Sequence, residues 1–384
     1  MHAEQFHSRR AGVLVKVHPG TSAEFLAFDP APVPRELALG ADVVLALSEA
    51  DQALGRLAGL GGRLPDPHIL IQPYLRREAV ASTRIEGTQS TLGEVLSAEA
   101  RRLPESADVR EVLNYVRALE MGLARLASLP LSNRLLREMH VELLRGVRGA
   151  ERTPGEFRTS PNWIGGHGPA DAVFVPPPAE RMADALSDLE RYLHDDPPLP
   201  ILVRCALIHY QFETIHPFLD GNGRLGRLLI VFYLVERRVL HDPLLYLSSY
   251  LERHRDEYVA RLQAVREEGD YENWVTFFLK AVSTQATAAI QTAESLLRLA
   301  TEFRERLRRI RARGQAVDAA EMLIGNPYLS APRLAETLRL TRQGGQYVIA
   351  TLERAGIVEP AAGESRPALY VANEVLEVLQ QDGD

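Results

Sequence analysis

The chain has very little cysteine and no long apolar stretch among its 384 residues. The single cysteine, Cys205, excludes an intrachain disulfide, so the fold does not require an oxidising compartment. Cys205 lies in the apolar run 201–208, which predicts a buried and unreactive thiol. No apolar stretch reaches the length of a bilayer span, and residues 1–4 do not open a secretory signal. We therefore expect a cytoplasmic protein without a membrane segment.

An excess of positive charge is also missing. The sequence has 44 Lys and Arg against 51 Asp and Glu, a net charge of −7, which argues against broad nucleic-acid binding by the whole protein. The hydrophobic content of 46% and the charged content of 25% are those of an ordinary soluble protein. The length is sufficient for two or three domains with substantial cores.

The most informative stretch is HPFLDGNGRLGR, residues 216–227. Its glycines predict a tight loop, and the apolar pattern that begins at Arg224 predicts a helix buried on most sides. A glycine-rich loop that runs into a helix N-terminus directs backbone N–H groups and the positive end of the helix dipole at one place. Gly221, Asn222 and Gly223 allow the backbone to approach a phosphate, with the Asn222 amide as an added donor. This pattern predicts a phosphate-binding site.

The charged and titratable side chains of this stretch predict its chemistry. Asp220 is a hard oxygen ligand suited to Mg²⁺, which proteins usually hold with one or two carboxylates and the phosphates of the substrate. Arg224 and Arg227 are three residues apart, so both can bind phosphate oxygens at the same end of the helix. His216 is the natural general base, because histidine titrates near neutral pH. Together they predict transfer of a phosphate-containing group from a metal-bound nucleotide to a hydroxyl.

The commoner nucleotide motifs, GxxxxGK[ST] and GxGxxG, do not match this stretch. It resembles the motif of the Fic family, HxFx[DE]GNGRxxR, and every specified position is met. The alternative is a capped core helix that begins with a Gly-Asn turn. That alternative explains the glycines but leaves four residues without a role: His216, Asp220, Arg224 and Arg227.

The resemblance covers roughly residues 65–280 and implies a mainly α-helical fold, with a Fic-type core and a β-hairpin flap. It implies transfer of AMP from ATP to a Ser, Thr or Tyr hydroxyl of a protein, with release of pyrophosphate. On the matching positions, His216 would deprotonate the hydroxyl and Asp220 would bind Mg²⁺. Residues 221–224 would form the anion hole, and Arg227 would hold the γ-phosphate.

A second motif, STRIEG at residues 82–87, resembles the inhibitory signature [ST]xxxE[GN] of the same family. Ser82, Glu86 and Gly87 occupy its specified positions. The resemblance implies that Glu86 pairs with Arg227 and occupies the place that the γ-phosphate of ATP needs. A Ser with a Glu four residues later is also common on solvated helix faces, but its occurrence together with the catalytic motif favours the inhibitory interpretation.

The segment 155–178 is the most loop-like part of the core and indicates a short hairpin. In the resemblance this hairpin is the flap, which aligns the target segment by strand addition, and an ordinary surface hairpin remains the alternative. His167 could suggest a metal site together with His209 and His216. Their spacing gives no second-ligand pattern, so we expect core or surface histidines instead.

The rest of the chain is predicted from its periodicity and its breaks. Ser132 is an N-cap candidate. The expected elements are strands near 13–17 and 24–28 and helices near 42–57, 67–86, 109–126, 133–147 and 271–313. The expected domains are an N-terminal region with the inhibitory helix at 1–105, the Fic catalytic core at 106–285, a helical linker at 286–314 and a separate domain at 315–384.

The last of these domains resembles a winged helix. We expect helices at 319–324 and 331–338, a third helix capped by Thr341, and a strand pair around Gly363. If the domain reads DNA, the base-side residues are Arg342, Gln343 and Gln346. Residues 314–384 hold five Arg against ten Asp or Glu, 5 − 10 = −5, which is opposite to a DNA-binding footprint. This balance favours a protein-interaction or dimerisation module, and a homodimer is left open.

Six arginines lie between residues 304 and 313, which indicates a solvated helix end or, alternatively, a stripe that faces phosphate. For the whole chain the favoured function is a regulated AMP transferase with a protein substrate, the chain itself among the candidates. The alternatives are a transcription regulator or adaptor whose Fic core senses nucleotide, and removal of AMP by the same site.

Overall fold

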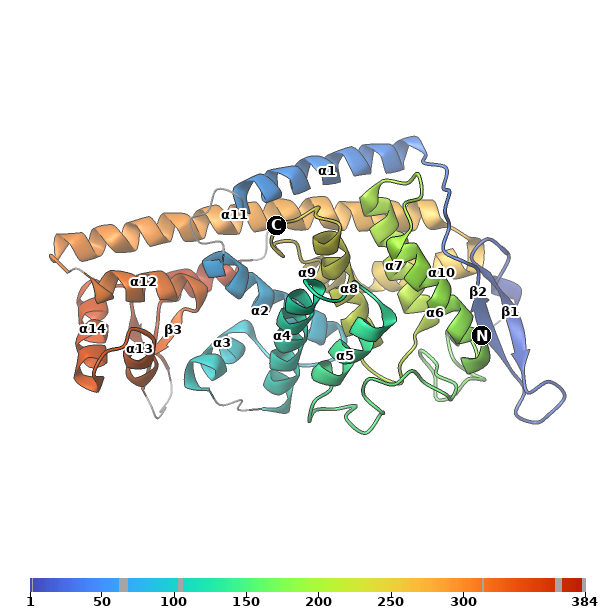
Figure 1. The fold of residues 1–384 in the computed structure, drawn as a ribbon, viewed down its shortest axis with the longest axis horizontal. Coiled ribbons are helices and arrows are strands. Elements are labelled where there is room, and N and C mark those ends of the chain that lie inside the picture. The colour runs from blue at the N-terminus through green and yellow to red at the C-terminus, as the bar shows by residue number, and fades with distance from the viewer. Residues whose placement is uncertain (2, 62–67, 103–105, 313, 363–367, 382–384) are drawn as a thin grey trace. The chain divides into compact units, whose positions relative to one another are not determined.

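The computed structural model describes residues 1, 3–61, 68–102, 106–312, 314–362 and 368–381. The described chain is mainly helical with small antiparallel sheets (Figure 1), so the predicted fold class is confirmed. It divides into two compact units. Unit 1 comprises residues 1–53, 117–240 and 250–284, and unit 2 comprises residues 54–116, 241–249 and 285–384. Each unit is described by itself.

Four of the described helices contribute residues to both units: α1 (Ala41–Gly61), α4 (Ala107–Leu126), α11 (Tyr271–Arg309) and, by its first two residues, α9 (Ser248–Arg253). The other elements of unit 1 are a 3-10 helix (Ala3–Gln5), β1 (Gly12–Val17), β2 (Phe25–Pro30), α5 (Asn133–Leu143), α6 (Ala179–His194), α7 (Ile201–Ile215), α8 (Asn222–Glu236) and α10 (Arg255–Glu268). The expected strands are found as the antiparallel pair β1–β2, in which Val15 lies opposite Ala27. Ser132 caps α5 as predicted, although α5 ends four residues earlier than expected.

Helices α7 and α8 form the centre of unit 1, and nearly every residue of both is buried. They cross closely at Gly226, where an added Cβ would overlap the carboxylate of Glu213 and lie 3.1 Å from the ring of Phe212. Cys205 is fully buried in α7, as predicted, and burial raises the pKa of its thiol. The chain therefore places two buried helices in contact immediately before and after the motif loop.

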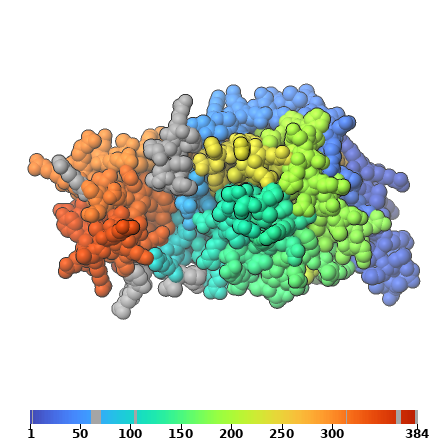
Figure 2. All heavy atoms as spheres, in the orientation of Figure 1, coloured from blue at the N-terminus to red at the C-terminus, as the bar shows by residue number. Residues whose placement is uncertain are grey.

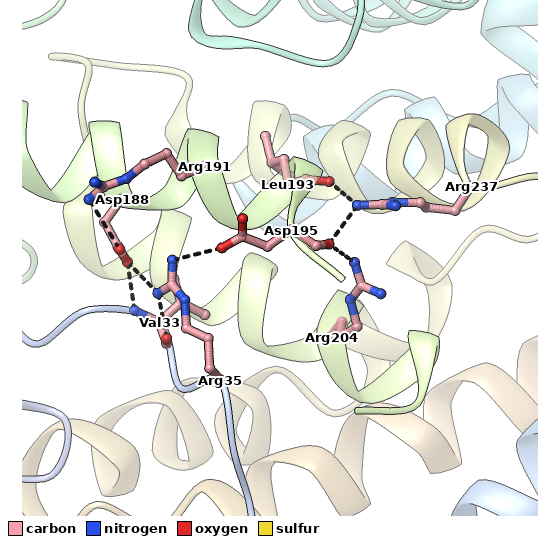
Figure 3. Close-up of polar contacts among 8 residues, drawn as sticks. All are labelled: Val33, Arg35, Asp188, Arg191, Leu193, Asp195, Arg204 and Arg237. Carbon is pink, nitrogen blue, oxygen red and sulfur yellow. Dashed lines mark hydrogen bonds and ion pairs between the residues drawn. The ribbon is translucent and has the colours of Figure 1, made fainter. Parts of the chain in front are cut away.

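Arginines hold the connection between α6 and α7 (Figure 3). Asp188 of α6 accepts hydrogen bonds from the Val33 N–H at 2.8 Å and from Arg35 at 3.0 Å. Backbone carbonyl groups at the end of α6 accept hydrogen bonds from Arg204 and Arg237. These carbonyls would otherwise lack an intrahelical partner, so the arginines fix the point from which α7 starts. The atoms of α5 and α6 form part of a continuous surface on the face shown in Figure 2.

Unit 2 contains α2 (His68–Ile85), the helix predicted to carry the inhibitory motif. The other elements that lie wholly within this unit are α3 (Leu92–Arg101), α12 (Gln315–Gly325), β3 (Tyr328–Ser330), α13 (Ala331–Thr337), α14 (Arg342–Arg354), β4 (Glu359–Pro360), β5 (Leu369–Val371) and α15 (Asn373–Gln380). The sequence did not predict α3, which begins with a capping box between Thr91 and Glu94. Pro67 and Gly363, at the predicted helix start and strand turn, lie outside the described residues.

The C-terminal segment, residues 315–380, has the expected helices followed by a returning strand pair. Thr341 caps α14 by accepting a hydrogen bond from the Gly344 N–H at 3.1 Å. Two elements were not predicted, the strand β3 and the helix α15. The strand order is β3-β5-β4, with both pairs antiparallel.

The arginine-rich end of α11 is partly engaged with this segment. Arg304 donates to Glu321 of α12 at 2.6 Å, and Arg306 donates to Glu374 of α15 at 2.6 and 2.7 Å. Two of the six arginines therefore form ion pairs, whereas Arg308, Arg309 and Arg311 are exposed, as expected for a solvated helix end. Arg313 lies outside the described residues.

The predicted base-side residues Arg342, Gln343 and Gln346 lie on the exposed face of α14, beside Tyr347, whose side chain is 70% exposed. Their role in binding DNA stays a prediction. Among the helices that the structure describes, none is both long enough and apolar enough to cross a bilayer.

Candidate active site

His216 ends α7 in a left-handed conformation, with φ 48° and ψ 61°. Its N–H still donates to the Phe212 carbonyl at 2.9 Å, so the residue caps the helix. The following residue, Pro217, disfavours the α region for His216 and so helps to end the helix there. A non-glycine residue in this conformation costs about 1–2 kcal/mol, which surrounding contacts must offset. His216 is half-buried at the start of the motif loop.

Asn222 closes this loop. Its side-chain oxygen accepts from the Phe218 N–H at 2.9 Å, and its side-chain nitrogen donates to the Phe218 carbonyl at 2.8 Å. The side chain is buried, so it satisfies its polar groups on the nearest backbone. One of the two N–H groups of the Asn222 amide is thus engaged within the loop. Its role as an added donor to a bound phosphate stays a prediction.

The loop leads directly into the N-terminus of α8. Gly221 is the N-cap residue and has φ 77°, a conformation that favours glycine. No side chain of the described residues caps α8, and the first N–H groups of a helix have no intrahelical acceptor. Gly221, Asn222 and Gly223 therefore provide the backbone geometry of an anion site, as the sequence indicates.

Asp220 lies at the edge of this helix end with its side chain 35% exposed. One carboxylate oxygen accepts from the Gly221 N–H at 2.6 Å and lies 3.4 Å from Arg224. Gly149 packs against the other oxygen, where an added Cβ would lie only 2.7 Å away. A partly exposed carboxylate fits a cation that phosphate oxygens also bind. Among the described residues, no cluster of three or more His, Cys, Asp or Glu side chains could hold a metal alone.

Arg224 and Arg227 are almost completely buried, with 1% and 2% of their surfaces exposed. They lie one turn apart on the first part of α8. Burial of a guanidinium is costly unless anionic or polar partners compensate it, which is consistent with a helix end that binds phosphate. The structure thus brings His216, Asp220 and the two arginines onto one loop and one helix.

Ser82, Glu86 and Gly87 belong to unit 2, where the structure describes them at the end of α2. Ser82 is completely buried. The N–H groups of Glu86 and Gly87 each donate, at 3.0 Å, to carbonyls three residues earlier, and Gly87 has φ 97°. The motif therefore spans the last turn of a helix and its glycine end. Its pairing with Arg227 stays a prediction.

His140 is a residue of this site that the sequence did not reveal. Its Nδ1 accepts a hydrogen bond from the Gly155 N–H at 2.8 Å, so Nε2 carries the proton and donates to the Asp220 carbonyl at 2.9 Å. The ring stacks on Phe218 with centroids 3.9 Å apart. Burial lowers the pKa of His140 to about 4, which keeps the ring neutral. His140 therefore supports the backbone of the metal-ligand candidate.

Arg158 was also missed. Its guanidinium is buried and donates only to backbone carbonyls among the partners that the structure describes for it. Those carbonyls belong to His216 at 2.9 Å, Ile215 at 3.3 Å, Pro177 at 2.6 Å and Ser160 at 3.3 Å. Burial lowers the pKa of Arg158 to about 10. Arg158 thus links the loop that presents His216 to both ends of segment 160–177.

That segment is the predicted hairpin. Ile164 and Phe174 pair in an antiparallel bridge, with N–H···O distances of 2.8 and 3.1 Å. Phe174 is buried, whereas Trp163 and Val173 are 39% and 59% exposed. The hairpin is confirmed, and its role as a flap over the site stays a prediction.

The two other histidines considered for a metal site, His209 and His167, lie in different environments: one is in the core and the other at the surface. His209 donates from Nδ1 to the Gly226 carbonyl at 3.0 Å and accepts from the Tyr258 hydroxyl at 2.8 Å. Burial lowers the pKa of His209 to about 3. His167 is exposed, and its backbone N–H donates to Asp171. The prediction of core or surface histidines is met, since His209 is buried and His167 is exposed.

The site thus combines a helical core, a loop that presents a histidine, and a glycine-capped helix end with buried arginines. The sequence comparisons identify the family. Residues 44–124 match the Fic/DOC family N-terminal region, and residues 130–234 match the Fic/DOC family. The chain therefore contains an N-terminal region and a domain of the Fic/DOC family.

Curated relatives with similar sequences are named as protein adenylyltransferases. A probable protein adenylyltransferase of Aquifex aeolicus is 31% identical over 96 residues, 25% of this chain and 28% of the relative. The protein adenylyltransferase Fic of Drosophila yakuba is 29% identical over 205 residues, 51% of this chain and 38% of the relative. The chain therefore spans well under half the length of these two relatives.

Solved structures show the same fold. A Fic family protein from Desulfovibrio desulfuricans G20 has a TM-score of 0.56 at 23% identity, covering 89% of this chain and 98% of that one. Fic-1 of Caenorhabditis elegans, residues 134–508, has a TM-score of 0.53 at 22% identity, covering 66% and 74%.

Proposed function

We propose that this protein is a protein adenylyltransferase that moves AMP from ATP to a Ser, Thr or Tyr hydroxyl, and that Glu86 inhibits it. One observation carries the proposal: a single loop, closed by Asn222, presents His216 at one end and the N-terminus of α8 at the other. The names of the relatives support the same reaction.

The proposed reaction uses these groups in sequence. The hydroxyl oxygen of the target attacks the α-phosphorus of ATP while His216 accepts its proton, and the bond to pyrophosphate breaks. The N–H groups of residues 221–224 bind the phosphates whose charge develops in the transition state. Arg227 holds the γ-phosphate. When it is bound at Asp220, Mg²⁺ supplies charge neutralisation for the phosphates.

Intact-protein mass spectrometry after incubation with ATP and Mg²⁺ tests the proposal by detecting AMP added to the protein itself or to proteins of a lysate. The starting protein is Glu86→Gly, since inhibition would suppress the wild type. In that background His216→Ala should keep ATP binding but lower transfer by at least about 10²-fold, the usual scale for loss of a general base. Undiminished transfer by His216→Ala would overturn the proposed base.

The same assay tests the metal assignment. Asp220→Ala, or addition of EDTA, should abolish most transfer because the phosphates lose their bridging cation. Calorimetric titration of Mg²⁺ in the presence of a non-hydrolysable ATP analogue gives a second readout, in which Asp220→Ala should weaken metal binding. Full activity in metal-free buffer would contradict the role of Asp220.

A further inference from the structure

The inhibitory segment, residues 82–87, is connected to two helices of unit 2. It includes the last turn of α2, and four residues after its end Thr91 caps the start of α3 with its capping box. Between them, the Thr88 N–H donates to the Thr83 carbonyl at 3.3 Å, and the Gln89 N–H donates to Asp108 at 2.7 Å. A movement of α2 or α3 would therefore move Glu86.

Both helices contact the C-terminal segment defined above. Helices α12 and α15 pack on α2, and β3 and β5 pack on α3. The Asn326 side chain donates to the Leu96 carbonyl of α3 at 3.1 Å. The Tyr328 hydroxyl lies 3.3 Å from the position of a Cβ on Gly93, so this glycine permits the close approach of β3 to α3.

A charged cluster joins the same three parts of the chain. Arg76 of α2 donates three hydrogen bonds to Glu99 of α3, at 2.9, 3.0 and 3.2 Å, and both side chains are mostly buried. The guanidinium of Arg333 in α13 interacts electrostatically with the charges of Glu99, Arg76 and Arg102. Burial lowers the pKa of the Arg333 guanidinium, and the nearby Glu99 opposes that shift. The Arg333 cation of the C-terminal segment thus interacts electrostatically with both members of the ion pair that joins α2 to α3.

We infer that the C-terminal segment holds α2 and α3 in the arrangement that positions the inhibitory segment. Gly93, Asn326 and Arg333 are then positioning residues for inhibition. The inference rests on the proposed function, because it assigns a cause to the placement of Glu86. It also gives the C-terminal segment a role within the chain, through a face other than the exposed face of α14.

The first test enlarges Gly93. In Gly93→Leu the new side chain would occupy the space of the Tyr328 hydroxyl and should separate β3 from α3. The helix α3 itself should not be destabilised, because leucine has a higher helix propensity than glycine. Self-modification with ATP and Mg²⁺ should rise at least about threefold, a shift of about 0.7 kcal/mol between inhibited and active states. The matched control is Gly55→Leu on α1, a helical glycine with nothing within 4 Å of the added Cβ, which should behave as wild type.

A second pair of variants reverses charge instead of adding volume. Arg333→Glu places a carboxylate beside Glu99 and should raise self-modification, whereas Arg342→Glu, on the exposed N-terminus of α14, should not. Hydrogen exchange of residues 84–90, measured by mass spectrometry on folded protein, should be faster in Gly93→Leu and Arg333→Glu only. Unchanged exchange and unchanged self-modification in both folded variants would overturn the inference.

The last arm separates this inference from the proposed function. If the C-terminal segment acts through Glu86, Gly93→Leu should add nothing to the rise seen in Glu86→Gly. An equal additional rise in that background would show a route that bypasses Glu86 and would overturn the inference. If neither Glu86→Gly nor Gly93→Leu transfers AMP, the proposed function is wrong, and the exchange of residues 84–90 alone decides whether the segment holds α2 and α3.

Discussion

At the residue scale, Arg158 shows how one buried side chain can organise a loop. Its guanidinium presents several donors in a fixed plane, and its acceptors lie both in the motif, at His216, and in the hairpin segment, at Pro177. Lysine keeps the charge but not this geometry. Arg158→Lys should therefore lower the free energy of unfolding by about 2 kcal/mol, the scale of hydrogen bonds to a charged group, and also lower transfer.

Chemical denaturation and the transfer assay on the same preparations check this prediction. The control is Arg181→Lys, since Arg181 is exposed and pairs with Asp29 at the surface. Equal stability and activity of Arg158→Lys and wild type would show that the carbonyl contacts do not organise the loop.

The buried histidines predict a pH dependence of stability. Folding lowers the pKa of His140 to about 4 and that of His209 to about 3, whereas an exposed histidine titrates near 6.5. Below pH 6.5 the unfolded chain therefore binds protons that the folded chain does not. Stability should fall as the pH drops from about 6.5 towards 4, by up to about 1.4 kcal/mol per pH unit for each histidine.

Urea unfolding at several pH values between 7.5 and 5 measures this slope. His140→Gln retains a donor at the position of Nε2 and removes one titrating group. The free energy of unfolding of this variant should therefore change less steeply with pH, by the contribution of about one bound proton. A free energy of unfolding that does not change across this range would contradict the neutral, buried state of both rings.

At the scale of elements, the crossing of α7 and α8 sets the distance between His216 and the anion site. Gly226→Ala should destabilise the protein by about 1–3 kcal/mol, because the added Cβ meets Glu213 and Phe212 in a packed interior. AMP transfer should fall as well, although the substitution removes none of the side chains or N–H groups proposed to take part in the reaction. Gly59→Ala on α1, where the added Cβ meets nothing within 4 Å, should be neutral or stabilising. Thermal unfolding of both variants checks the difference.

Local pattern was sufficient to predict the elements that carry the motif. The glycines and the apolar pattern after Arg224 specify a loop and a buried helix through short-range effects, and both were found. The helix begins at Asn222, two residues earlier than predicted, so Gly223 lies in its first turn and not in the loop. The short elements were missed. Helix α3 has only ten residues and strand β3 only three, so their periodicity is weak, and β3 pairs with β5 some forty residues later.

Long-range contacts explain the residues of the site that were not predicted. His140 reaches a carbonyl 80 residues away, and Arg158 reaches one 58 residues away. Neither role leaves a local signal, because each depends on how distant segments pack. Asn222 was placed in the correct loop, but its side chain bonds to the loop backbone, which spacing alone could not distinguish from a ligand contact.

At the scale of the whole molecule, the proposed function requires the inhibitory segment of unit 2 to act on the catalytic helix of unit 1. Glu86 is proposed to compete with the γ-phosphate of ATP for Arg227, so that nucleotide binds in an unproductive pose. A pair that disfavours the productive pose by about 1.4 kcal/mol suppresses it tenfold, and a desolvated pair could do more. Regulation would then be a property of the single chain.

Glu86→Gly should therefore raise self-modification by one or more orders of magnitude, because Arg227 becomes available to the γ-phosphate. Glu86→Gln removes the charge but keeps a polar side chain, and it should give a smaller rise. Glu86→Gly combined with Arg227→Ala should lose the gain, since the guanidinium that the phosphate needs is gone. Mass spectrometry of all three variants beside wild type measures these differences. If Glu86→Gly modifies neither itself nor a lysate more than wild type does, Glu86 is an ordinary surface carboxylate and the chain has no inhibitory segment.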